Sequence, residues 1–183
     1  YADKNMNFEN LTIDNGLSQA TAEAIVQDSD GYVWIGTNDG LNRYNGSEIK
    51  VFDSNDEDEN SIISNYITAL AEDKNKNLWV GTDEGLSKIN LSNYSISNYR
   101  YNKKDKDISY YAIITMYVDD KGNLYVGNNK GVYLYDEKID DFNKVFGIEN
   151  GLIDENIYSI TKDKYDNLWI GTNQGLHKVD SKS

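Results

Sequence analysis

The residues best suited to chemistry in this chain are its carboxylates, and one run of them has the spacing of a calcium-binding loop. Asp28, Asp30 and Gly31 follow one another as in the first half of such a loop. An EF-hand loop needs glycine at its sixth position, but Val33 stands there. The later copies of the stretch carry other residues in place of Asp30, namely Lys76, Lys121 and Tyr165. The pattern therefore predicts a hairpin turn, and no metal site is expected.

Other side chains that commonly carry catalysis are scarce, because the chain has one histidine and no cysteine. His177 occupies a position that varies between repeats, and no nucleophile is matched to it. Asp and Glu are abundant, so a carboxylate pair for glycoside hydrolysis stays open, although no pair has the apolar surroundings that would raise one pKa. We expect no catalytic residue and no cofactor.

The overall charge limits the classes of partner. The 183 residues carry a formal net charge of −13, which repels phosphate backbones and disfavours nucleic-acid binding. No apolar run of about 18 residues and no secretion signal is visible, so we expect no membrane contact by this segment itself.

A repeated motif positions these residues. It reads DGYVWIGTNDGL at 30–41 and returns as NLWVGTDEGL, NLYVGNNKGV and NLWIGTNQGL. The aromatic residues are 45, 46 and 44 positions apart, a period that is typical of propellers and solenoids. The motif predicts a buried ring, a glycine for close approach and a glycine for a turn. The residues assigned to this structural role are Trp34, Gly36, Gly40, Trp79, Gly81, Gly85, Tyr125, Gly127, Gly131, Trp169, Gly171 and Gly175.

Short apolar runs separated by Asp-Gly, Gly-Asn and Asp-Asn turns predict four antiparallel strands in each repeat. Glycines interrupt every window that a helical repeat would need. The sequence therefore predicts an all-β protein, a β-propeller of four repeats of about 45 residues that forms part of a larger ring. The expected blades cover about 17–55, 62–101, 108–147 and 152–180, within one propeller segment at 1–183.

An outer strand is expected before the first blade, because NFENLTI at 7–13 matches EIKVFDS and FNKVFGI. The fourth blade lacks its own outer strand, which residues 7–13 or another chain would supply. Three arrangements stay open. The chain is the first part of a longer propeller, or it pairs with a second copy to close a ring, or it closes alone.

The runs GLSQATAEAIVQDSDGYVWIGTNDGLNRYNG and GLIDENIYSITKDKYDNLWIGTNQGLHKV resemble the two-component-regulator propeller repeat. The third copy departs most, with Tyr125, Asn128 and Val132 in place of Trp, Thr and Leu. The resemblance implies a propeller sensor ectodomain of a bacterial receptor, extracytoplasmic and membrane-anchored in the full-length protein. The attached output would be a histidine kinase or a cyclic-dinucleotide synthase, and the ligand a polysaccharide fragment.

In a propeller, the loops that enter the inner strands and those between the second and third strands share one face at the channel mouth. These loop residues differ between repeats while the core positions recur, which favours a ligand site that suits an oligosaccharide or another small extracellular molecule. The candidate ligand residues are Gln19, Thr21, Asn38, Asp39, Asn65, Tyr66, Asp83, Glu84, Tyr110, Tyr111, Asn128, Lys130, Asp154, Glu155, Asn156, Asn173 and Gln174. We expect a non-enzymatic sensor; a propeller lyase or hydrolase and a dimerisation scaffold that binds no ligand are the alternatives.

Overall fold

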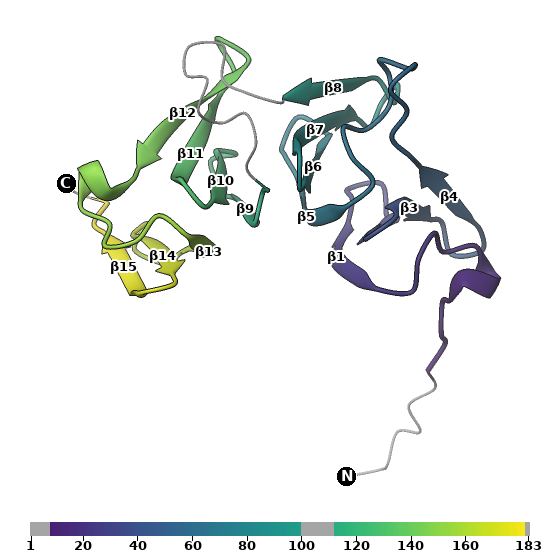
Figure 1. Cartoon of the computed structure of the whole chain (residues 1–183), viewed down its shortest axis with the longest axis horizontal. Coiled ribbons are helices and arrows are strands. Elements are labelled where there is room, and N and C mark those ends of the chain that lie inside the picture. Colours follow the sequence, from purple (N-terminus) through teal and green to yellow (C-terminus); the bar gives the residue numbers. More distant parts are fainter. Residues whose placement is uncertain (1–7, 100–111, 182–183) are drawn as a thin grey trace.

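The computed structural model describes residues 8–99 and 112–181. These residues form four antiparallel sheets that stand side by side along an open arc (Figure 1). Sheet order follows the chain, so the sheet of β1 and the sheet of β13 lie at the two ends of the arc (Figure 1).

The described elements are mostly short strands. In chain order they are η1 (Ile13–Asn15), β1 (Ala22–Gln27), β2 (Val33–Thr37), β3 (Gly40–Tyr44), β4 (Ile49–Phe52), β5 (Ile67–Glu72), β6 (Asn77–Thr82), β7 (Gly85–Asn90), β8 (Ile96–Tyr99), β9 (Thr115–Val118), β10 (Leu124–Asn128), β11 (Gly131–Asp136), β12 (Asp141–Phe146), η3 (Ile148–Asn150), β13 (Ile157–Lys162), β14 (Leu168–Thr172) and β15 (Gly175–Val179).

Each sheet is built from consecutive hairpins. The strand orders are β1-β2-β3-β4, β5-β6-β7-β8, β9-β10-β11-β12 and β13-β14-β15. The first strands of neighbouring sheets contact one another, β1 with β5, β5 with β9 and β9 with β13. The inner strand therefore comes first in every blade, and the predicted all-β propeller architecture is confirmed. We call the sheets blades 1 to 4.

Neighbouring blades join through the glycine that follows each aromatic residue. A Cβ atom built on Gly36 would lie 2.4 Å from Cγ2 of Ile67, which starts the inner strand of the next blade. Gly81 meets Ile113 in the same way, at 2.8 Å, and Gly127 meets Ile157 at 2.6 Å. Because contacts between carbon atoms are most favourable at about 3.5–4.0 Å, each of these positions needs a residue without a side chain. This joint recurs three times along the arc.

The aromatic rings of the motif fill the space between blades at blades 1 and 2, whereas Tyr125 and Trp169 are only partly buried. Trp34 and Trp79 are completely buried, and Trp34 packs in one cluster with Leu78 and Val80 of blade 2. Trp169 is only half-buried, and the neighbouring Leu176 is 65% exposed although its equivalent Leu41 is 0% exposed. The outward face of blade 4 therefore presents core residues to solvent.

The outer strand predicted at residues 7–13 is not formed. Residues 8–12 have no strand pairing, Ile13 begins the 3-10 turn η1, and Asn7 lies outside the described residues. A strand needs a neighbouring strand to satisfy its backbone groups, and β15, which has none on its outer side, lies at the opposite end of the arc (Figure 1).

Candidate functional site

The aspartates that precede each aromatic residue hold their own hairpins together. Asp28 is buried; its Oδ2 accepts a hydrogen bond from the Trp34 indole at 2.7 Å, and its Oδ1 accepts the amide of Tyr32 at 2.8 Å. The same indole bond joins Trp79 to Asp73 at 2.8 Å and Trp169 to Asp163 at 2.9 Å. These carboxylates are structural, because their lone pairs are directed at the protein's own donors.

The stretch with calcium-loop spacing is such a hairpin. The Asp30 amide donates to Asp28 Oδ1 at 3.1 Å, and the Asp30 carboxylate pairs with Lys76 at 2.6 Å. Across the described ranges, 8–99 and 112–181, no group of three or more His, Cys, Asp or Glu side chains could hold a metal ion.

Blade 3 departs from this arrangement because Tyr125 replaces the tryptophan and removes the indole donor. Lys162 of blade 4 takes its place, donating to Asp119 Oδ2 at 2.6 Å with its ammonium 5.2 Å from the centre of the Tyr125 ring. Burial alone would raise the pKa of Asp119, but the bonds from Lys162 and Asn123 outweigh it and lower that pKa. The sequence signal for this exchange was the third copy's departure from the motif.

At the channel mouth the two predicted loop sets meet. The Gly40 amide donates to the Asn65 carbonyl at 2.7 Å, and the Asp83 amide donates to the Tyr66 carbonyl at 3.3 Å. Asn65 Nδ2 also reaches Asp39 Oδ1 at 3.4 Å. The loop that enters blade 2 therefore lies against the hairpin of blade 1 and against the hairpin of its own blade.

Several predicted ligand residues brace these loops. Asn65 Oδ1 accepts the Ser54 amide at 2.7 Å, and Asp83 Oδ1 accepts the Ser64 hydroxyl at 2.7 Å. The Glu84 amide donates to Thr82 Oγ1 at 3.1 Å. Gln19 accepts a bond from the Thr21 amide. These polar groups were predicted from the sequence to bind a ligand, but in the structure they form hydrogen bonds that fix the geometry of the loops.

The mouth between blades 3 and 4 is braced in the same way. Asn128 is buried, and its Oδ1 accepts the Lys130 amide at 2.8 Å. Asp154 accepts both the amide and the side-chain nitrogen of Asn156, and these bonds lower its pKa. Glu155 pairs with Lys144 at 2.7 Å, which lowers the pKa of the glutamate.

The remaining candidates divide into two groups. Asn173 and Gln174 are exposed in the last hairpin of the arc. Tyr110 and Tyr111 lie outside the described residues.

Two polar atoms in blades 1 and 2 stand out. Asn38 Oδ1, in the hairpin between β2 and β3, and Thr68 Oγ1, in the inner strand β5, are buried and have no hydrogen-bond partner among the described residues. A buried polar group without a partner costs about 1–3 kcal/mol. Tyr66, two residues from Thr68, is 43% exposed. We use the name mouth cluster for Asn38, Tyr66 and Thr68, which come from the hairpin of blade 1, the loop that enters blade 2 and the first strand of blade 2; they supply two oxygens without a described partner and an exposed ring.

Two clefts lie at the ends of the strands opposite the channel mouth. There, the turn between the first and second strands of one blade meets the neighbouring blade. A cleft of about 400 Å³ between blades 3 and 4 is lined by Tyr125, Phe146, Leu168 and Val179, among others. A second cleft of about 350 Å³ between blades 2 and 3 is lined largely by turn residues, including Asp73, Asn75, Asp136 and Glu137. Neither cleft was predictable from the sequence, because each depends on how two blades meet.

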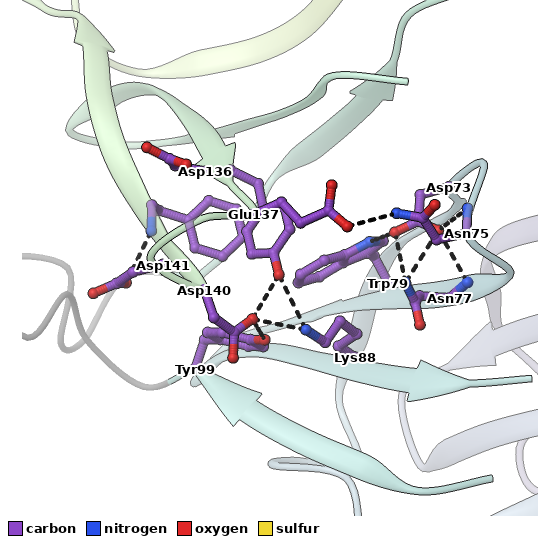
Figure 2. Close-up of polar contacts among 12 residues, drawn as sticks. Asp73, Asn75, Asn77, Trp79, Lys88, Tyr99, Asp136, Glu137, Asp140 and Asp141 are labelled. Carbon is purple, nitrogen blue, oxygen red and sulfur yellow. Dashed lines mark hydrogen bonds and ion pairs between the residues drawn. The ribbon is translucent and has the colours of Figure 1, made fainter. Parts of the chain in front are cut away.

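Beside the second cleft, the Asp140 carboxylate accepts hydrogen bonds from three side chains (Figure 2). Its Oδ1 accepts Tyr99 at 2.7 Å, Lys88 at 2.8 Å and Tyr135 at 2.5 Å. Burial alone would raise the pKa of Asp140, but these hydrogen bonds lower it to about 2. Burial, together with the bond to Asp140, raises the pKa of Tyr99. The network fastens blade 2 to blade 3, because Lys88 and Tyr99 come from one blade and the other two residues from the next.

His177 is half-buried in β15, and its Nε2 accepts the Ile153 amide at 3.5 Å. The imidazole therefore supports the loop that enters its own blade. No described helix has the length and apolar character needed to cross a bilayer.

Comparison with known proteins identifies the repeat. The family model of the two-component regulator propeller matches residues 16–39, 61–84 and 151–174. Each match runs from the entering loop to the second hairpin. The third blade, in which Tyr125 replaces Trp, is not among the matched segments.

One curated relative is histidine kinase P4 of Formosa agariphila, 43% identical over 58 residues. The match covers 32% of this chain and 4% of the kinase, so the chain spans a small part of that relative.

Solved structures with the same fold include extracellular domains of two-component systems of B. thetaiotaomicron. The domain of BT3049 has a TM-score of 0.80 at 21% identity, covering 96% of this chain and 26% of that one. The domain of BT4673 has a TM-score of 0.73 at 24% identity, covering 90% and 22%. An enzyme, virginiamycin B lyase of Staphylococcus aureus, has a TM-score of 0.59 at 18% identity, covering 87% and 55%. These likenesses establish the fold. The chain is therefore a β-propeller segment, and three of its four repeats match the two-component regulator propeller model.

Proposed function

We propose that this propeller segment is the ligand-reading part of a bacterial two-component receptor, held outside the cytoplasm and connected to a membrane anchor in the full-length protein. The observation that carries the proposal is the repeat itself, which matches the regulator family at three blades and a histidine kinase at 43% identity over 58 residues. Solved relatives with this fold are extracellular domains of two-component systems, which supports an extracytoplasmic location.

We place the ligand at the mouth cluster. Its exposed phenol ring offers a stacking face for a sugar, and the buried Asn38 and Thr68 oxygens offer hydrogen-bonding capacity that the described residues leave unused. An oligosaccharide presents both apolar ring faces and hydroxyl donors, so it matches this combination.

We further propose that the segment binds without catalysing a reaction. The carboxylates with partners described above are directed at indole, amide, phenol and ammonium donors, and His177 accepts a backbone amide. None of these groups is arranged as a general acid opposite a base.

A glycan-binding screen by calorimetry, followed by variants, tests the proposal. Tyr66→Ala should weaken binding of any oligosaccharide hit at least tenfold, because the stacking face is lost. Tyr165→Ala is the matched control, since Tyr165 is an exposed tyrosine (67%) in a turn at the other end of the strands. Equal loss in both variants, or none in either, would remove the mouth cluster from the proposal. Conversion of the bound glycan to products, followed by mass spectrometry, would favour the lyase or hydrolase alternative.

A further inference from the structure

Ion pairs between turns close two of the described blade-to-blade joints at the end of the strands opposite the channel mouth. Each pair links the turns between the first and second strands of neighbouring blades. The pairs are Asp30–Lys76 at 2.6 Å between blades 1 and 2, and Lys121–Asp166 at 2.9 Å between blades 3 and 4. The corresponding positions between blades 2 and 3 hold Asn75 and Gly122, which cannot form an ion pair.

A second contact is also missing from the joint between blades 2 and 3. In blade 2, Glu72 at the end of the first strand accepts both the amide and the hydroxyl of Ser29 from blade 1, each at 2.7 Å. Lys162 at the same position in blade 4 donates to Asp119 of blade 3 at 2.6 Å. The corresponding residue of blade 3 is Val118, whose side chain has no polar group. The joint between blades 2 and 3 is therefore closed by neither contact.

The turn between the third and fourth strands differs in the same place. In blade 2 this turn contains Leu91, which is 6% exposed in the core cluster and whose amide donates to the carbonyl of Lys76 at 2.9 Å. In blade 3 the position of Leu91 is taken by Glu137, and that of Lys76 by Gly122. Both Glu137 and Gly122 line the cleft of about 350 Å³. This cleft therefore lies where blade 2 has a buried leucine and a lysine that crosses the joint.

Two hydrogen bonds link blades 2 and 3 at the cleft. The side-chain nitrogen of Asn75 donates to Glu137 Oε1 at 3.2 Å (Figure 2). Lys74 Nζ donates to the carbonyl of Lys121 at 3.3 Å, and the stem of this lysine passes over Gly122, because a Cβ built there would lie 2.4 Å from Lys74 Cδ. The cleft is thus bordered by long side chains of both blades, whose rotamers can adjust to an occupant.

The lining combines charges of both signs with apolar carbon atoms. It includes the carboxylates of Asp136 and Glu137, the ammonium groups of Lys74 and Lys138, and the core residues Leu124 and Tyr135. Asp73 lines the cleft too, but its oxygens accept bonds from its own hairpin. A hydroxyl group donates and accepts at once, so it can bind a carboxylate and an ammonium together. An ion of either sign would meet like charges in the same lining.

We propose that the cleft between blades 2 and 3 binds a neutral mono- or disaccharide. The hydroxyls of such a ligand match the mixed charges, and the C–H groups of its ring can pack on the apolar carbons. The volume lies at the lower end of the range of about 300–1,000 Å³ for small-molecule pockets, which limits the size of the occupant. The site lies at the opposite end of the strands from the mouth cluster, so either site can exist without the other.

Saturation-transfer NMR titrations with glucose, galactose and maltose as probes test the proposal, with glucosamine and glucuronate as charged analogues. At least one neutral sugar should bind, and each charged analogue should bind less tightly. Glu137→Leu copies Leu91 into blade 3 and should weaken binding at least tenfold, because the leucine occupies the cleft. The melting temperature of this variant should not fall, since the change buries apolar surface. Glu48→Leu, at an exposed glutamate in the corresponding turn of blade 1, is the matched control and should leave binding unchanged.

A second variant closes the cleft from the other side. Lys74→Ser with Asn75→Asp and Gly122→Lys copies the residues that form the closed joint between blades 1 and 2. Lysine is compatible with this turn, because Lys76 already adopts a φ of 59° there. This triple variant should also weaken binding of the neutral sugar at least tenfold.

Tyr66→Ala distinguishes the cleft from the mouth cluster and should leave binding of the neutral sugar unchanged. Loss of this binding in Tyr66→Ala would assign the sugar to the mouth cluster, which would overturn the present proposal and support the proposed function. Binding retained by the triple variant would overturn it whatever the effect of Glu137→Leu. Failure of every neutral probe to bind, or tighter binding of a charged analogue, would overturn it as well.

Discussion

Alanine at Gly36 should destabilise the protein because the glycine leaves room for the next blade. The added Cβ would lie 2.4 Å from Ile67 Cγ2 and 2.9 Å from Ile67 Cβ. Two carbon atoms pack best at about 3.5–4.0 Å, so the contact with Cγ2 would be about 1 Å too short. Ile67 is completely buried and cannot move aside. Overpacking of this kind costs about 1–3 kcal/mol, and the lower entropy of the unfolded alanine chain offsets about 0.4–1 kcal/mol of that. We therefore expect a net loss of about 1–2 kcal/mol, or about 2–8 °C in Tm for a chain of this size.

The same substitution at Gly171 is the control, since its added Cβ would meet mainly the terminal hydroxyl of Ser159, which can rotate away. Gly171→Ala should change stability by less than about 0.5 kcal/mol. Urea unfolding of both variants, followed by tryptophan fluorescence, gives the comparison. Combining Gly36→Ala with Ile67→Ala should cost less than the two separate losses together, because the new methyl group occupies part of the space that the isoleucine leaves. Equal losses at Gly36 and Gly171 would refute the idea that the glycine is required by the next blade.

Three further predictions concern the polar contacts. Asp28→Ala should cost about 2–3 kcal/mol in urea unfolding, because it leaves the buried Trp34 indole without an acceptor; an unchanged midpoint would contradict this role. The depressed pKa of Asp140 contributes stability that is present above about pH 4 and is lost as the pH falls towards about 2. Asp140→Asn should remove this pH-dependent part of the stability, which amounts to at most about 1 kcal/mol because the pair with Lys88 is partly exposed. Melting temperatures of the variant and the parent chain between pH 2 and 5 measure the difference, and identical profiles would argue against the network. The raised pKa of Tyr99 should contribute stability that is present below the usual tyrosine pKa near 10 and is lost as the pH rises above it. The difference in phenolate absorbance between the parent chain and Tyr99→Phe reports the titration of this one phenol. Titration near pH 10 would contradict the prediction.

The sequence was sufficient for the architecture because the requirements of a blade recur. The regular spacing of Trp34, Trp79, Tyr125 and Trp169 predicts one aromatic ring in each blade. The glycines that follow them predict a close approach of the neighbouring blade. The identity of the approaching atom was not readable, because Ile67 lies in the next repeat and nothing local links it to Gly36. The segment at 7–13 has a pattern that matches β4 and β12, but a strand also needs a neighbour, and residues 8–13 have none in the described part of the chain.

The ligand residues were harder to read than the core. Asn65 and Asp83 have the composition of a binding rim, yet their side chains accept bonds from Ser54 and Ser64. A polar loop residue has the same appearance in a sequence whether it braces a turn or contacts a ligand. Asn38 and Thr68 differ only in what surrounds them, and that depends on two blades at once.

The exchange of a tryptophan for Tyr125 has a consequence for engineering. Blades 1 and 2 each contain both members of the indole–carboxylate bond, so either can be moved into a chimaeric propeller without losing that bond. Blade 3 borrows its cation from blade 4, since Lys162 supplies the donor for Asp119. Blades 3 and 4 should therefore be transferred together into a chimaeric propeller. Blade 3 transferred alone should need Tyr125→Trp, which would supply Asp119 with an indole donor.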